Sequence, residues 1–316
     1  MDALQRVASM IAGPDARADY QFTIPYGQAN EGIEVFSVCG GWEYVDERRR
    51  RFIKKKTIKK AEFQFVKLAC LLQDEFAKKY EIPAPAFLHV ERIDGAFYIF
   101  QEFVEGTHAY PVWSKNVALN VAHSIYRLNI GLDLLFFDHR VVPSKVVPFG
   151  DGLYRKISSV SQAETAQNIN RMAQDIEIKI LNHAQVICHN DVYWSNFAFN
   201  NNPSGQNINI KFIDFGMIGQ NYVGADLHHF AVDSIYHEKR KSFFEFLVRS
   251  YAKVSGFPEE TIAAAAFYYA AHRQAMRFIK AEKKEEAFER LCALLMSAQL
   301  ALGAAPARRR LPWAEG

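Results

Sequence analysis

The sequence has little cysteine. Its four cysteines are widely scattered among 316 residues, and no two of them have the C-x-x-C spacing of a metal-binding or redox pair. The four are Cys39, Cys70, Cys188 and Cys292. Neither a zinc site nor a disulfide framework is therefore predicted, and a cytoplasmic protein of the reducing cytosol is expected.

Long apolar runs are also missing. The most apolar stretch, residues 117–137, contains His123, Arg127 and Asp133, whereas a membrane-spanning helix needs roughly 20 predominantly apolar residues. This stretch is predicted to be a buried helix, and no membrane partner is expected. The N-terminus carries charges within its first six residues, so residues 1–20 are predicted to hold an amphipathic helix rather than a signal peptide.

No strong excess of one charge is present. Lys and Arg number 38 against 35 Asp and Glu, a formal net charge of +3, which does not require an anionic polymer as partner. One local exception is the basic run from Arg48 to Lys60, with nine Lys or Arg among thirteen residues. A solvated turn and helix start account for it, with one lysine directed at a ligand. A nucleic-acid or lipid patch is the less favoured alternative, and no nucleic-acid partner is expected.

Two short motifs carry the chemistry. HNDVYWSN spans residues 189–196 and IDFG spans residues 213–216. Together they hold the parts needed to move a phosphoryl group from ATP to a hydroxyl. Asp191 is predicted to orient the attacking hydroxyl and accept its proton, while Asn196 and Asp214 offer the oxygen ligands that Mg²⁺ prefers.

A hairpin is predicted between the two motifs. After Asn196 come the apolar FAF, the polar run NNNPSGQN and then INIKFID, in which apolar and polar residues largely alternate. This pattern is typical of two short strands joined by a Pro/Gly/Asn loop. The hairpin folds the chain back, and we expect it to bring Asp214 beside Asn196.

The pattern H-x-D-x-x-x-x-N followed by I-D-F-G resembles the aminoglycoside phosphotransferase and choline kinase family, small-molecule kinases of protein-kinase-like fold. The usual Gly and Leu-His of that motif are replaced here by Asn190, Val192 and Tyr193. The resemblance implies an α+β fold with two lobes: a nucleotide-binding lobe with a small antiparallel sheet over residues 1–105, and a larger helical lobe over residues 106–316 for catalysis and the acceptor.

The resemblance also implies a nucleotide site. In the family, a hydrophobic pair followed by Lys on the third strand binds the α and β phosphates, and the run Phe52-Ile53-Lys54 fits this form. Lys54 is the predicted residue, with Lys55 and Lys56 as alternatives in register. Glu62 is the predicted partner of this lysine.

A hinge segment is implied further along the chain, within FYIFQEFVEG. The backbone of Gln101, Glu102 and Phe103 is expected to bind the adenine of ATP. In the larger lobe, the resemblance implies that His189 supports the catalytic loop and that a buried Asp226 braces it. Neither residue is predicted to be the base.

Two sequence motifs are absent, and their absence restricts the predicted function. No G-x-G-x-x-G phosphate loop occurs, and Gly40-Gly41 is the one glycine pair in a suitable place. No A-P-E segment follows IDFG, which argues against a protein kinase. The predicted enzyme is a kinase that transfers the γ-phosphate of Mg-ATP to a hydroxyl of a sugar, aminoglycoside or amino alcohol. A non-catalytic nucleotide-binding regulator and a protein kinase are the alternatives.

The acceptor is only weakly indicated. Residues 233–290 contain nine Asp or Glu against eleven Lys or Arg, so a polycationic acceptor is not favoured. Phe267, Tyr268 and Tyr269 could form an aromatic cage for a choline-type ligand, but core packing is the preferred interpretation. Neutral or anionic hydroxyl compounds fit best. The adjacent His228 and His229 are expected to point to different sides of a helix, which disfavours a shared metal.

Overall fold

The chain forms two compact units. The computed structural model describes residues 2–26, 31–42, 50–57, 59–104, 113–141, 163–181, 185–199, 210–278 and 284–303. Unit 1 consists of Met1–Tyr110, Trp194–Ser204 and Ile208–Ile218, and unit 2 of Pro111–Tyr193, Gly205–Asn207 and Gly219–Gly316. The division differs from a single cut after residue 105, because most of the segment between the two motifs returns to unit 1.

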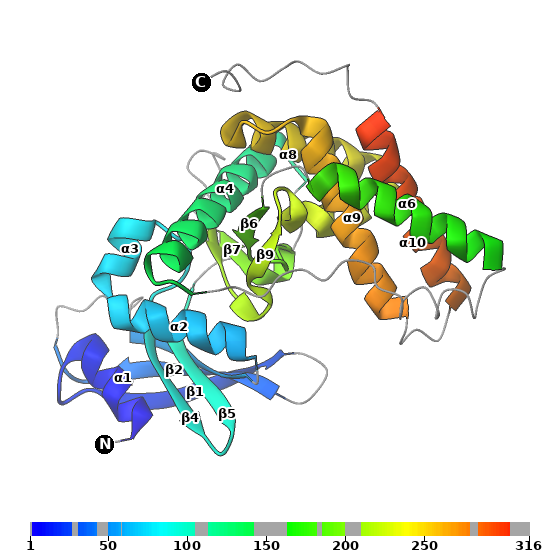
Figure 1. Cartoon of the computed structure of the whole chain (residues 1–316). Helices are drawn as coiled ribbons and strands as arrows, with labels where there is room; N and C mark the ends of the chain where they lie inside the picture. Colours follow the sequence, from blue (N-terminus) through cyan, green and yellow to red (C-terminus); the bar gives the residue numbers. More distant parts are fainter. Residues whose placement is uncertain are drawn as a thin grey trace. The chain divides into compact units, whose positions relative to one another are not determined.

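Unit 1 is built on a five-stranded antiparallel sheet with strand order β1-β2-β3-β5-β4 (Figure 1). The strands are β1 (Arg17–Tyr26), β2 (Glu31–Cys39), β3 (Arg51–Thr57), β4 (Phe87–Ile93) and β5 (Ala96–Glu102). Its helices are α1 (Ala3–Ala12), α2 (Lys60–Leu72) and α3 (Asp74–Tyr80). This sheet is the one predicted for the first lobe.

Helix α1 agrees with the predicted N-terminal helix. Asp2 caps its start by accepting a hydrogen bond from the backbone amide of Gln5 at 2.9 Å. It ends at Gly13, whose φ of +96° lies in the region that favours glycine. Its apolar residues pack in one core cluster with Phe36, Phe52 and Phe100 of the sheet, so the helix covers one face of that sheet.

Helix α2 is joined to the IDFG motif through aromatic side chains. Phe65 of α2 stacks on Phe215 with ring centroids 4.5 Å apart, and Phe87 of β4 contacts both rings at 5.7 and 6.0 Å. Phe65 and Phe215 are fully buried. These contacts fix the position of the motif within unit 1.

The predicted hairpin is present. Strand β7 (Phe197–Phe199) pairs antiparallel with β8 (Ile210–Phe212), and Phe197 lies opposite Phe212. The backbone amide of Ile213 donates to the carbonyl of Asn196 at 2.9 Å. The predicted loop over residues 200–207 lies outside the described residues. The hairpin brings the backbone of Asn196 next to the residue that precedes Asp214.

Unit 2 is mainly helical. Its helices are α4 (Lys115–Asp138), α6 (Ala163–Leu181), α7 (His228–Tyr236), α8 (Glu238–Ser255), α9 (Glu259–Phe278) and α10 (Lys284–Gly303). A two-stranded sheet pairs β6 (Gln185–Cys188) with β9 (Gly219–Tyr222). Short 3-10 turns lie at the ends of the motifs: η2 (Trp194–Asn196) is the end of the first motif and η3 (Phe215–Met217) begins within the second, both in unit 1. A further 3-10 turn, η4 (Ala225–Leu227), lies in unit 2.

The apolar stretch at 117–137 forms α4, as predicted, and eleven of its residues are buried. Asn129 lies among them and donates its amide hydrogen to the carbonyl of Ile187 at 3.1 Å. Among the helices that the structure describes, none combines the length and apolarity needed to cross a membrane. Helix α4 is a core helix of unit 2.

Candidate active site

A buried ion-pair cluster lies in unit 1. The ammonium group of Lys55 on β3 lies 2.7 Å from Glu62 Oε1 and 2.7 Å from Asp214 Oδ1. Each of the three side chains is less than a tenth exposed. Burial lowers the pKa of Lys55, and Glu62 partly restores it. The structure therefore joins the predicted Glu62 and Asp214 through one lysine.

The lysine paired with Glu62 is Lys55, one of the two alternatives in register, and not Lys54. Lys54 instead forms an ion pair with Glu34 of β2 at 2.8 Å, and its side chain is a quarter exposed. Successive side chains of a strand point to opposite faces, and Lys54 shares the face of Phe52, which packs in the α1 core. Lys56 is exposed. Only Lys55 is both buried and paired with Glu62.

Asp214 has an unusual backbone. Its φ of +61° and ψ of +68° are left-handed, a conformation that is uncommon outside glycine and is often found at functional sites. Burial raises the pKa of Asp214, and a hydrogen bond from the backbone of Gly216 acts in the opposite direction. A second lysine, Lys59, lies 3.8 Å from Asp214 Oδ1. The motif analysis did not single out Lys59.

The hinge residues are mostly engaged within unit 1. Gln101 is buried in β5, and the Glu102 carboxylate forms an ion pair with Lys211 at 2.7 Å. The backbone amide of Glu102 donates to the carbonyl of Ala86 at 2.8 Å, and that of Phe103 donates to the carbonyl of Arg51 at 3.1 Å. These two amides are thus engaged within unit 1, and the binding of adenine by the backbone of this segment stays a prediction.

Gly40 and Gly41 form a turn against helix α1. Both have left-handed φ values, +74° and +71°, and a Cβ on Gly41 would lie 2.8 Å from the carbonyl carbon of Ala12. The amide of Trp42 donates to the carbonyl of Ala12 at 2.6 Å. The glycine pair therefore serves the packing of α1. The connection between β1 and β2, residues 27–30, lies outside the described residues.

Asp191 lies in unit 2, and two basic side chains contact it. His229 Nε2 of α7 is 2.9 Å from Asp191 Oδ1, and the Arg273 guanidinium of α9 is 3.5 Å from the same oxygen. Burial acts to raise the pKa of Asp191, but the hydrogen bond from His229 and the charges of His229 and Arg273 outweigh it and lower the pKa far below its usual range. Asp191 is therefore ionised at neutral pH. Its contacts with His229 and Arg273 were not predicted.

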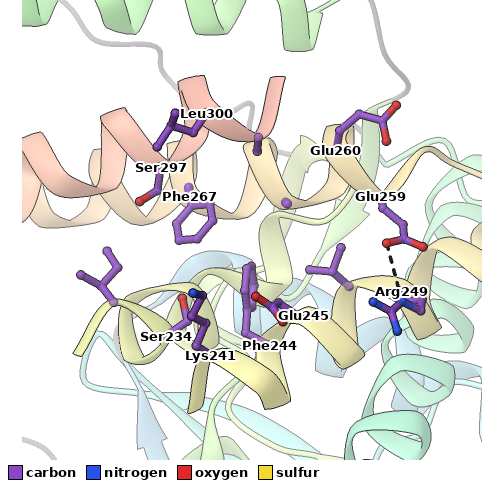
Figure 2. A pocket seen from close by; sticks show the side chains of 14 residues that line it. Ser234, Lys241, Phe244, Glu245, Arg249, Glu259, Glu260, Phe267, Ser297 and Leu300 are labelled. Carbon is purple, nitrogen blue, oxygen red and sulfur yellow. Dashed lines mark ion pairs between the residues drawn. The ribbon is translucent and has the colours of Figure 1, made fainter. Parts of the chain in front are cut away.

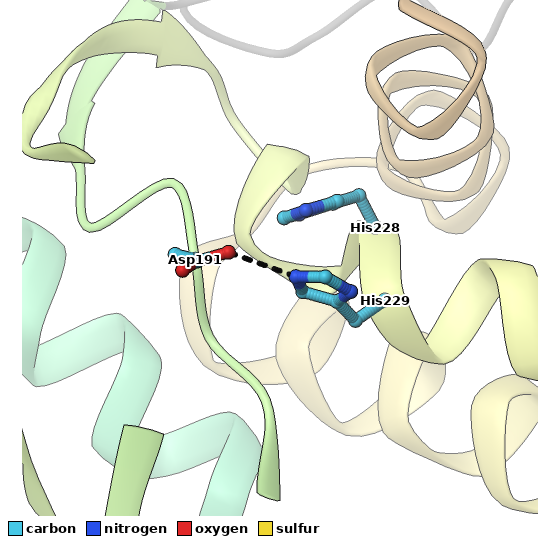
Figure 3. A group of neighbouring side chains, drawn as sticks. All are labelled: Asp191, His228 and His229. Carbon is cyan, nitrogen blue, oxygen red and sulfur yellow. Dashed lines mark hydrogen bonds and ion pairs between the residues drawn. The ribbon is translucent and has the colours of Figure 1, made fainter. Parts of the chain in front are cut away.

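His228 and His229 converge on Asp191, contrary to the expectation that they diverge (Figure 3). Their ring centroids are 4.1 Å apart, and ligand atoms of both lie within 4.8 Å of an Asp191 oxygen. His228 and His229 are the first two residues of α7, directly after the 3-10 turn η4. Arg273 beside the same carboxylate opposes the binding of a cation there.

The Asp191 loop is held by a buried hydrogen-bond network. Asp226, which is 1% exposed, accepts from the backbone amides of Asn190 at 2.6 Å and His189 at 3.3 Å. It also accepts from the side chain of Asn129 at 2.9 Å. The bracing role implied for Asp226 is thus visible as hydrogen bonds to the loop that carries Asp191.

The aromatic run on α9 does not form a cage. Tyr268 and Tyr269 are buried in the core of unit 2, which agrees with the preferred interpretation. Phe267 lines a cavity of about 700 Å³ whose walls come from α7, α8, α9 and α10 (Figure 2). The polar residues around it include an ion pair between Arg249 and Glu259. Asp191 is not one of the residues that line this cavity.

A protein-family model matches part of the chain. The model of the ecdysteroid kinase-like family matches residues 152–254, a segment that includes Asp191, Asn196, Asp214 and His229 but covers 103 of the 316 residues. A search of curated protein sequences gives no match. The matched segment is thus the part of the chain with both chemical motifs.

Solved structures give the fold. The GDP complex of wild-type aminoglycoside 2'-phosphotransferase-IIIa has a TM-score of 0.56 and 14% identity, covering 89% of this chain and 94% of that chain. A thermostable mutant of aminoglycoside phosphotransferase APH(4)-Ia, in a ternary complex with ADP and hygromycin B, has a TM-score of 0.57 and 11% identity, covering 97% and 100%. The predicted protein-kinase-like fold is confirmed.

Proposed function

We propose that the chain is an ATP-dependent phosphotransferase that moves the γ-phosphate of Mg-ATP to a hydroxyl of a small molecule. The observation that carries the proposal is the Lys55 ammonium group, 2.7 Å from both Glu62 and Asp214. A lysine held by a glutamate and placed beside a metal-binding aspartate is the nucleotide machinery of protein-kinase-like enzymes. In this role Lys55 binds the α and β phosphates.

Asp214 and Asn196 would hold the magnesium ion. Both offer oxygen atoms, the donors that this hard cation takes, and substrate phosphates and waters complete its coordination. Asn196 is 7% exposed, and the hairpin holds its backbone against Ile213. When bound, the ion neutralises charge that develops on the triphosphate.

Asp191 would orient the acceptor hydroxyl. Its lowered pKa keeps it an ionised hydrogen-bond acceptor, although such a carboxylate is a weak base. Phosphoryl transfer passes through a loose transition state and depends mainly on positioning and electrostatics, so a weak base suffices. His229 fixes the carboxylate from the side of α7 by its 2.9 Å hydrogen bond.

The acceptor is proposed to be a neutral or anionic hydroxyl compound, such as a sugar. Arg273 and His229 lie 3.5 and 2.9 Å from the carboxylate that would bind the acceptor. Both are groups that would repel a polycation when charged. Amino alcohols and aminoglycosides are therefore placed behind sugars and sugar acids in an acceptor screen.

The first experiment is thermal unfolding of the wild type and of Asp214→Ala with and without ATP and Mg²⁺. A ligand that binds the native state raises its stability by mass action. We expect a magnesium-dependent shift in the wild type that is lost in Asp214→Ala and retained in the control Lys54→Ala. ADP release with the acceptor panel then separates an enzyme from a non-catalytic regulator. No shift in the wild type at millimolar nucleotide would refute the proposal.

A further inference from the structure

Two lysines converge on one oxygen of Asp214. Lys55 lies 2.7 Å and Lys59 3.8 Å from Asp214 Oδ1. They differ in exposure, because the Lys55 side chain is 8% exposed and that of Lys59 is 42% exposed. Lys55 is also fixed by Glu62. Lys59 is thus the ammonium group of the pair with room to move toward a ligand.

Gly216 makes the space that Lys59 occupies. A Cβ at this position would lie 2.5 Å from Lys59 Nζ and 2.9 Å from its Cε, which is closer than such atoms can approach. The backbone of Gly216 is not in the left-handed region that favours glycine, so the lack of a side chain matters here for space. The glycine of IDFG therefore admits the second lysine to Asp214.

The backbone of Lys59 is anchored, and its side chain is partly exposed. Lys59 is the N-cap residue of α2, and its amide donates to Thr57 Oγ1 at 3.1 Å. Its carbonyl accepts from the amide of Phe63 at 3.2 Å. A fixed Cα with a long, partly exposed side chain allows the ammonium group to change partners by rotamer changes alone.

The charges of this cluster indicate what Lys59 would bind. Lys55 and Lys59 balance Glu62 and Asp214 in the absence of a nucleotide. If Asp214 binds a cation, the positive charge of Lys59 needs another anion nearby. A triphosphate supplies it, and the sequence has no G-x-G-x-x-G loop to hold the terminal phosphate.

We propose that Lys59 is a second phosphate-binding residue, which contacts the terminal phosphate of ATP and so distinguishes ATP from ADP. This inference rests on the proposed function. It also assigns a role to part of the basic run between Arg48 and Lys60 that does not involve nucleic acid. In this arrangement Lys55 binds the α and β phosphates, and Lys59 binds the γ-phosphate.

The test is calorimetric binding of Mg-ATP and Mg-ADP to the wild type, Lys59→Gln and Lys60→Gln. Lys60 is the matched control, because it is the next lysine of the run and is exposed. We expect Lys59→Gln to lose about tenfold in affinity for ATP, the scale of one charge-assisted contact, and less than about threefold for ADP. Lys60→Gln should bind both nucleotides as the wild type does.

Gly216→Ala provides a second variant in which Lys59 is present but displaced. The atoms in the way are the end of a flexible side chain, so the variant is expected to fold, and its unfolding midpoint without nucleotide checks this. It should show the same selective loss for ATP. Equal losses for ATP and ADP in Lys59→Gln, or none, would overturn the inference while leaving the proposed function intact. Absence of nucleotide binding in the wild type would instead refute the proposed function, and the inference with it.

Discussion

The two charged clusters of this protein differ in burial. In unit 1, Lys55, Glu62 and Asp214 are each less than a tenth exposed and are paired at 2.7 Å. In unit 2, the Asp191 and Arg273 side chains are between a fifth and a quarter exposed. A buried charge depends on its partners, whereas a partly exposed charge can be hydrated when a partner is lost.

This difference in burial predicts which variants change stability and which change only turnover. Removal of a partner in unit 1 leaves an unpaired buried charge, so nucleotide binding and folding should change together. Removal of Asp191 leaves cationic groups that water can reach, so turnover should change alone. A unit 1 variant that changes only nucleotide binding or only folding would contradict this division. So would an Asp191 variant that changes stability.

The largest effect is expected for Asp191→Asn. Turnover should fall at least about 10³-fold, or about 4 kcal/mol in activation free energy, because the acceptor hydroxyl loses its orienting carboxylate. Mg-ATP affinity and the unfolding midpoint should match the wild type. ADP release measures turnover, and calorimetry measures Mg-ATP affinity. Turnover near that of the wild type would remove Asp191 from the mechanism.

Asp226→Ala should affect stability most. It removes the acceptor for two backbone amides and for Asn129, and leaves these buried donors unsatisfied, at a cost of about 3 kcal/mol in the free energy of unfolding. Denaturant unfolding measures the change. Asp226→Asn is the control, since it keeps an oxygen acceptor and should lose less. An Asp226→Ala variant as stable as the wild type would contradict the bracing role.

Lys55→Met and Lys54→Met test which of the two lysines binds the nucleotide. The Lys55 variant should lose about 30-fold in Mg-ATP affinity, or about 2 kcal/mol, and some stability, because Glu62 and Asp214 lose their shared cation. The Lys54 variant loses only a partly exposed ion pair with Glu34 and should change little. Calorimetric measurement of Mg-ATP affinity in both variants distinguishes the two lysines. The opposite ranking would restore the original prediction.

A smaller, pH-dependent effect is expected at Asp133 in unit 2. Burial raises its pKa to about 6 from 3.8, although its carboxylate accepts a hydrogen bond from the amide of Ile187. Since the folded state holds its proton more tightly than the unfolded state, stability should decrease as the pH rises from 4 to 6.

Asp133→Asn should remove this loss. It should stabilise the fold by about 1 kcal/mol at pH 7, allowing for partial exposure, and should have little effect at pH 4. Denaturant unfolding of the two proteins at pH 4, 5, 6 and 7 measures the difference. A constant difference across that range would show that Asp133 does not titrate in it.

The sequence predicted features whose partners are close along the chain. The hairpin between the motifs, α1 and α4 follow from local patterns. Asp191, Asn196 and Asp214 were identified by motif, as was Glu62. Position within a known pattern singled out these residues, and their roles stay predictions.

Features that depend on tertiary packing were missed. His229 and Arg273 reach Asp191 across 38 and 82 residues of sequence, and no local pattern connects them. The sequence left Lys55 as an alternative to Lys54, because both faces of β3 carry buried side chains and its pattern lacks a simple alternation. Gly40-Gly41 proved to be a packing turn for α1.

Three consecutive lysines on β3 occupy three different environments: a surface ion pair, a buried cluster and solvent. Chemically they are interchangeable, so they cannot themselves determine which of them becomes buried. Their uncharged neighbours Phe52 and Thr57, which are both buried, determine which lysine is buried. In a redesign of this strand, the identity of the buried lysine would therefore be set by residues outside the ion-pair cluster.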